Sequence, residues 1–198
     1  MAVSHPERVD KLVFLDGAYD WADPDYKAAF DALPPILLDT PAAAMKSFDA
    51  YVAYEKTIDY SQLHDMRRIE AYLKESVMVR PDGSVQPRMA DGVMAALTAA
   101  LWTNPLRDYT RVRSPALAIF AQSMTDLHGA DTERRERGRA WERQYMAPFR
   151  AKSVERVRRE LADVRILRVA GAHDSFFLTS RAQVVTAMRQ FLLARRSR

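Results

Sequence analysis

The feature that most constrains the fold of this chain is a set of three short apolar runs, each followed by helical sequence. The runs are KLVFL (11–15), PALAIFA (115–121) and VRILRVA (164–170). The second run shows no alternation of polar and apolar residues, which is expected of a strand covered on both faces of a parallel sheet. Strands that alternate with helices in this way predict an α/β fold built on a parallel sheet.

The sequence beyond the second run predicts several helices. Ser180 and Gln183 have the spacing of a capping box, so we expect the last helix to begin there. The apolar stripe of that helix consists of Val184, Val185, Met188, Phe191 and Leu192. The stretch 133–168 reads as two helices broken near Pro148.

The same stretch holds 12 Lys and Arg residues against 6 Asp and Glu residues, in a chain whose formal net charge is +4. Acidic and basic side chains alternate at helical spacing, for example Glu133 with Arg137, as on a helix face exposed to water. The sequence contains no nucleic-acid-binding motif. We therefore expect no nucleic-acid partner, and an Arg-rich nucleic-acid-binding surface is the weakest of the functional hypotheses.

Composition excludes several other classes of protein. Apolar residues make up 48% and charged residues 28% of the chain, and no run approaches the roughly 18 apolar residues of a membrane span. The N-terminal sequence lacks the zones of a signal peptide, so we expect a cytoplasmic protein without a membrane partner. There is no cysteine, and the histidines at positions 5, 64, 128 and 173 do not pair at ligand spacing, so we expect no metal site and no cofactor.

Between the first two apolar runs lies a long segment, 21–110, without a convincing central strand. Helix-start signals stand at Thr40-Pro41 and at Ser61, and RPDGS (80–84) predicts the tip of a small hairpin. The segment is rich in aromatic residues. We interpret it as a helical insertion between two strands of one sheet.

Chemically useful side chains follow the predicted strands. Asp16 and Asp20 come after the first strand, Asp126 after the second and His173 after the third. The carboxyl ends of parallel strands meet at one edge of the sheet, where working groups gather. An acid followed by a histidine is the order of the last two members of a Ser-Asp-His triad.

With these residues in view, the sequence resembles the C-terminal part of an α/β-hydrolase fold protein over essentially its whole length. HPERVDKLVFLDG resembles the entry into the sixth strand, RVRSPALAIFAQSMTD the seventh strand and acid loop, and VRILRVAGAHDSFFLTSRAQVVTAMRQFL the eighth strand, histidine loop and final helix. The resemblance implies a partial α/β-hydrolase fold, a parallel sheet remnant flanked by helices. Residues 1–20 and 111–198 would form its core and 21–110 a helical cap.

The resemblance implies that His173 is a general base and Asp126 the acid that orients it. Asp131 is a rival to Asp126 in the same loop region. Asp16 and Asp20 are further alternatives for the acid, because some members place it after the sixth strand. The family's G-x-S-x-G nucleophile motif does not occur among the 6 glycines of the chain. We therefore expect the nucleophile to precede the present sequence, and this chain alone to lack serine-hydrolase activity.

The intact protein is accordingly expected to be a hydrolase that cleaves an ester, an amide or a similar small substrate, with an apolar acyl or aromatic group in the aromatic-rich cap. The alternative is a non-catalytic module that binds a ligand or a protein on a hydrolase scaffold. A first strand without its outer neighbour would leave an exposed sheet edge, which predicts self-association through that edge.

Overall fold

The computed structural model describes residues 2–58, 60–63, 66–89 and 92–194. Its main sheet contains β1 (Leu12–Leu15), β4 (Ala116–Ser123) and β5 (Val164–Ala172) in the order β1-β4-β5, and both pairings are parallel. The three strands cover the three apolar runs, so the predicted α/β fold with a parallel sheet is confirmed.

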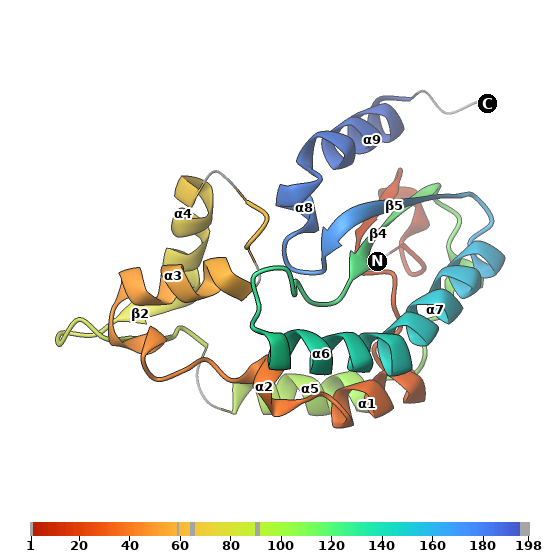
Figure 1. The fold of residues 1–198 in the computed structure, drawn as a ribbon. Helices are drawn as coiled ribbons and strands as arrows, with labels where there is room; N and C mark the ends of the chain where they lie inside the picture. Colours follow the sequence, from red (N-terminus) through yellow and green to blue (C-terminus); the bar gives the residue numbers. More distant parts are fainter. Residues whose placement is uncertain (1, 59, 64–65, 90–91, 195–198) are drawn as a thin grey trace.

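Helices cover both faces of this sheet (Figure 1). One face packs under α7 (Ala147–Glu160), and the other packs under α9 (Arg181–Leu193). Successive residues of β4 point to opposite faces: Ala116, Ala118 and Phe120 join the α7 side, and Leu117, Ile119 and Ala121 join the α9 side. All six are at most 2% exposed, as predicted for a central strand without polar alternation.

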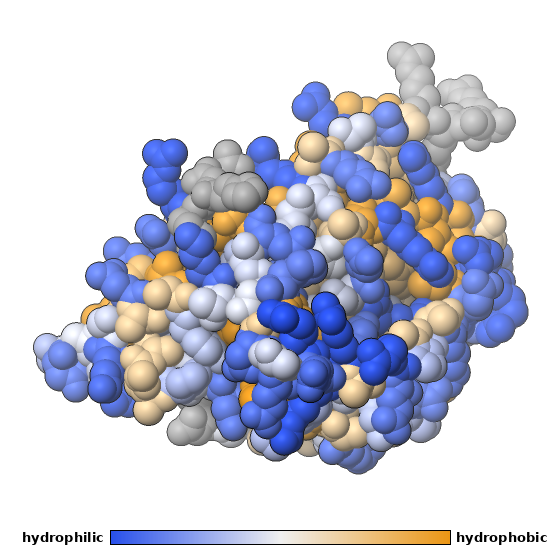
Figure 2. All heavy atoms as spheres, in the orientation of Figure 1, coloured by the Kyte–Doolittle hydropathy of each residue, from blue (hydrophilic) through white to orange (hydrophobic). Residues whose placement is uncertain are grey.

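The predicted helix break near Pro148 is wrong in detail. Helix α6 (Thr132–Trp141) continues through a π-helical turn (Glu142–Met146) into α7, where Pro148 lies in the first turn. A proline has no amide hydrogen to donate inside a continuous helix, and the π-helical turn lies just before it. Figure 2 shows hydrophilic surface over α6, and Glu133 pairs with Arg137 at 2.8 Å.

The C-terminal helix forms without its predicted capping box. A short helix, α8 (Phe176–Thr179), precedes α9, and the Ser180 side chain donates to the Ala170 carbonyl of β5 at 2.8 Å rather than capping α9. Val184 is buried as predicted, but Val185 and Leu192 are 40% and 46% exposed. Met188 and Phe191 are partly buried against the same face of the sheet as Val184.

In its described residues, the segment 21–110 contains helices and one hairpin but none of the strands of the main sheet. Its hairpin pairs β2 with β3 around the predicted turn, whereas the helix starts predicted at Thr40-Pro41 and Ser61 do not occur. Its elements are α1 (Pro24–Asp31), α2 (Pro35–Leu38), α3 (Phe48–Ile58), α4 (Met66–Ser76), β2 (Val77–Val79), β3 (Val85–Pro87) and α5 (Val93–Thr103).

Short 3₁₀ turns complete the described structure, at Pro6–Arg8, Ala44–Lys46 and Tyr109–Arg111. Figure 1 shows α3, α4 and the hairpin projecting to one side, away from the three-stranded sheet. Within the described ranges, no helix is both long enough and apolar enough to cross a membrane.

Candidate active site

His173 follows the last residue of β5, where the chain turns toward α8. Gly171 adopts φ +106°, and a Cβ there would lie 2.3 Å from the Thr179 hydroxyl and 2.9 Å from the Phe176 Cα. Glycine is therefore required for this tight turn. The His173 amide donates to the Ser123 carbonyl at the end of β4, at 2.9 Å, which ties the turn to the sheet.

The imidazole of His173 meets the carboxylate of Asp16, with Nδ1 and Oδ2 2.7 Å apart. Asp16 follows β1, has a φ of +46° and is fully buried. An ionised carboxylate only accepts hydrogen bonds, so Nδ1 carries the proton and the neutral ring keeps a lone pair on Nε2. No hydrogen bond joins Nε2 to any residue that the structure describes.

Charge and burial act against each other on His173. Burial lowers the pKa of its imidazole, but the hydrogen bond to Asp16 and the negative charges of Asp174 and Asp16 outweigh this effect. The pKa therefore lies above its ordinary value of 6.5. The His173 side chain is 30% exposed, so the ring can still exchange a proton with a ligand or solvent. Its Nε2 lies 4.0 Å from the Asp174 carboxylate.

The other oxygen of Asp16 is held by two donors that the sequence did not single out. The Tyr19 hydroxyl donates to Oδ1 at 2.7 Å, and the Ala121 amide of β4 donates to it at 2.9 Å. These bonds compensate for the burial of an ionised carboxylate, which is costly without partners. They also fix the direction in which the carboxylate faces His173.

Asp126, the acid expected from the sequence, does not contact His173 in the structure. Its side chain accepts from Ser61 at 3.1 Å and lies 3.0 Å from His128 Nδ1. Nearby, a Cβ on Gly129 would lie 2.1 Å from the Thr57 carbonyl, which shows how closely the loop after β4 approaches the inserted segment. Asp126 is therefore a link between that loop and the inserted segment, and the expected pairing with His173 is corrected to Asp16.

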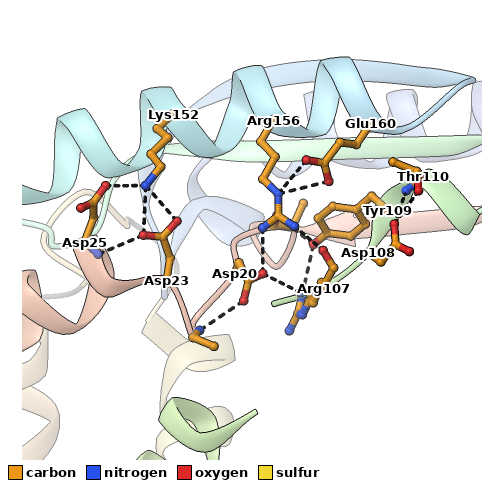
Figure 3. A network of polar contacts seen from close by, with 12 residues as sticks. Asp20, Asp23, Asp25, Arg107, Asp108, Tyr109, Thr110, Lys152, Arg156 and Glu160 are labelled. Atoms are coloured by element: carbon orange, nitrogen blue, oxygen red, sulfur yellow. Dashed lines mark hydrogen bonds and ion pairs between the residues drawn. The ribbon is translucent and has the colours of Figure 1, made fainter. Parts of the chain in front are cut away.

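The two remaining aspartates also lie elsewhere. Asp131 caps α6 by accepting from the Arg134 amide at 2.8 Å. Asp20 binds Arg156 of α7 at 2.8 Å and accepts from the Arg107 amide at 2.7 Å, within the polar network shown in Figure 3. Of the four aspartates considered from the sequence, Asp16 is the one that the structure brings to His173.

Comparison with solved structures identifies the scaffold. The chain is similar to E-2-(acetamidomethylene)succinate hydrolase, with a TM-score of 0.61 and 20% identity over 98% of this chain and 61% of that one. It is also similar to a probable hydrolytic enzyme from Pseudomonas aeruginosa, with a TM-score of 0.50 and 16% identity over 98% of this chain and 58% of that one. The chain has part of the α/β-hydrolase fold.

It thus spans about 60% of the length of these two hydrolases. No family model and no curated protein sequence matches the chain. The partial α/β-hydrolase fold expected from the sequence is confirmed by the structural similarity.

Two serines lie near the strand ends. Ser175 is fully buried, and its hydroxyl has no hydrogen-bond partner among the described residues. The backbone carbonyl of Ser123 accepts from the His173 amide. The described residues also contain no group of three potential metal ligands, and His64 lies outside them.

Aromatic rings form one wall beside His173. The Trp21 ring stands nearly perpendicular to the imidazole, with centroids 6.0 Å apart, and contacts Tyr19 and Tyr26 on its other sides. Trp21 also borders a cavity of about 280 Å³, whose lining includes Leu101 and Pro105 together with Asp20 and Arg107. The Trp21 ring therefore lies between the imidazole and this cavity of mixed polarity.

Proposed function

We propose that this chain carries the base and the acid of a serine hydrolase with the α/β-hydrolase fold. The observation that supports this most strongly is the 2.7 Å contact between His173 Nδ1 and the fully buried Asp16 carboxylate. This contact between Asp16 and His173 lies at the carboxyl ends of parallel strands, the edge where the active sites of open α/β sheets form. The structural similarity to hydrolases supports the same scaffold.

In this proposal, His173 Nε2 takes the proton of a serine hydroxyl as the serine attacks a carbonyl carbon, and later returns it to the leaving group. Asp16 holds Nδ1–H, which selects the tautomer with a free Nε2 and stabilises the imidazolium that forms. Asp16 takes the role first assigned to Asp126.

The serine itself is proposed to lie in sequence upstream of the present chain. The family's G-x-S-x-G motif is absent from these 198 residues, and the motif needs small residues because its serine sits in a strained strand-to-helix turn. The chain also covers about 60% of the two hydrolases it is similar to. We therefore expect the chain alone to be inactive.

The substrate is proposed to be a small ester, amide or related compound with an apolar acyl or aromatic group. In this proposal residues 21–110 form a cap over the core made by 1–20 and 111–198. The aromatic wall that Trp21 forms with Tyr19 and Tyr26 beside the imidazole supports an apolar group next to His173.

The test extends the natural gene upstream in frame and measures hydrolysis of p-nitrophenyl acetate and labelling by a fluorophosphonate. We expect the extension to encode a G-x-S-x-G serine that is labelled, and His173→Gln to lower kcat by roughly 10³-fold or more. His128→Gln is the matched control, because that imidazole is 71% exposed and contacts Asp126 instead of Asp16.

Three results would contradict the proposal. One is an extension that encodes no serine elbow, and another is a His173→Gln variant that remains as active as the control. The third is labelling of a serine within the 198-residue chain itself, which would mean that the nucleophile belongs to the present sequence.

A further inference from the structure

Arg150 of α7 donates hydrogen bonds to both residues that in turn donate hydrogen bonds to Asp16 Oδ1. Its Nε donates to the Tyr19 hydroxyl at 3.2 Å, and its Nη2 donates to the Ala121 carbonyl. The Tyr19 hydroxyl and the Ala121 amide in turn donate to Asp16 Oδ1. The four residues form a closed ring of hydrogen bonds behind the Asp16–His173 pair.

Asp16, Tyr19 and Ala121 are buried, and Arg150 is partly buried. Burial and the nearby Asp16 charge raise the pKa of Tyr19, so its phenol keeps the single proton that it donates to Asp16. Its oxygen is then free to accept from Arg150. Glu142, at the start of the π-helical turn, fixes the guanidinium from the other side at 2.7 Å.

A carboxylate that accepts strong hydrogen bonds on one oxygen is a weaker acceptor at the other. Donors to Oδ1 stabilise the negative charge of Asp16, which lowers the gain from binding an imidazolium proton at Oδ2. Arg150 adds a positive charge on the same side, which disfavours a second positive charge on His173.

We propose that Arg150 and Tyr19 are positioning residues that act on His173 through Asp16, holding the carboxylate in line and limiting how strongly it retains the imidazole proton. The catalytic role of these two residues rests on the proposed function. A general base works best when its proton affinity matches the working pH, and a buried aspartate without these donors would bind the proton too tightly.

The charged groups that face His173 have opposing effects on its pKa. Asp16 at the end of β1 and Asp174 next in the chain raise the pKa of His173, whereas Arg150 on α7 lowers it. Arg156, two turns further along the same helix, binds Asp20 and Glu160 and lies in the separate network of Figure 3. It offers a matched control on the same element.

The test is an NMR titration of the His173 ring in the 198-residue chain, with the signal assigned by its loss in His173→Gln. We expect Tyr19→Phe and Arg150→Gln each to raise the pKa of His173 by roughly half a unit or more. Arg150→Lys keeps the charge and should shift the pKa less than Arg150→Gln does. Arg156→Gln should leave the pKa of His173 unchanged.

Folding of each variant is checked by circular dichroism, and Tyr19→Phe and Arg150→Lys decide the outcome if Arg150→Gln does not fold. The proposal is overturned if the folded variants leave the pKa unchanged or lower it, or if Arg156→Gln shifts it equally. Because the titration needs no nucleophile, a negative result here leaves the hydrolase proposal standing. If the hydrolase proposal failed, the effect of Arg150 and Tyr19 on the pKa of His173 could still be measured.

Discussion

At the scale of residues, the candidate site depends on how one aspartate leaves its strand. Asp16 and His173 follow β1 and β5, which are separated by β4. The Asp16 amide donates to the Ile119 carbonyl of β4 and its side chain accepts from the Ala121 amide. The chain therefore bends over the end of β4, and the left-handed φ of Asp16 accompanies this bend.

A pH dependence of stability follows from the raised pKa of His173. Protonation of this ring stabilises the folded chain fully below the ordinary pKa of 6.5, and the contribution is lost as pH rises through the raised pKa. We expect the stability advantage of the natural chain over His173→Gln, measured by urea unfolding, to shrink as the pH rises from 6.5 through the raised pKa. An advantage that stays constant or grows over that range would be inconsistent with the raised pKa.

The sequence predicted His173 as a strand-end residue, but the family resemblance favoured Asp126 over the aspartate that contacts it. Asp16, Asp20 and Asp126 all follow predicted strands, so strand position alone does not separate them. The choice depends on tertiary contacts: Ser61 and His128 engage Asp126, and Arg156 engages Asp20. Such contacts join residues far apart in the chain and leave no local pattern.

At the scale of elements, the turn after β5 depends on Gly171. We expect Gly171→Ala to destabilise the chain by at least about 2 kcal/mol, because it combines a disfavoured φ with a close approach to α8. Gly83→Ala is the control, since Gly83 has a φ of +84° but open space around its Cα. Its cost should be about 1 kcal/mol. Equal unfolding midpoints for the two variants in urea would show that the contacts at Gly171 carry no cost.

Elements with a strong local pattern were predicted well. The continuous apolar run of β4 and the turn residues of the β2–β3 hairpin led to the right structures. Helix boundaries were predicted less well where a side chain had a better partner elsewhere. Ser61 donates to Asp126, and Ser180 donates to Ala170, so neither serine acts as the cap that its neighbours suggest.

At the scale of the whole molecule, β1 has a neighbour on one side within the described chain. The amides of Leu12 and Asp16 face β4, so strand alternation turns the peptide groups of Val13 and Leu15 toward the other edge. Figure 2 shows hydrophobic surface between α9 and the α6–α7 layer, where the sheet lies. We propose that this edge pairs with a second copy when the chain is on its own.

The edge proposal predicts concentration-dependent dimers in sedimentation analysis. Leu15 lies on β1 and is 44% exposed, so Leu15→Lys places a charge on this edge strand and should weaken the dimer at least tenfold. A chain that stays monomeric at all accessible concentrations would refute the proposal.

We propose that Asp16, and not Asp126, is the acid that sets the proton affinity of His173. The pKa of His173, measured by NMR in Asp16→Asn and in Asp126→Asn, tests this most directly. We expect Asp16→Asn to lower this pKa by roughly one unit or more, because it removes the charge that holds Nδ1–H. Asp126→Asn should leave it unchanged. A drop in Asp126→Asn with none in Asp16→Asn would show that Asp126 is the acid instead.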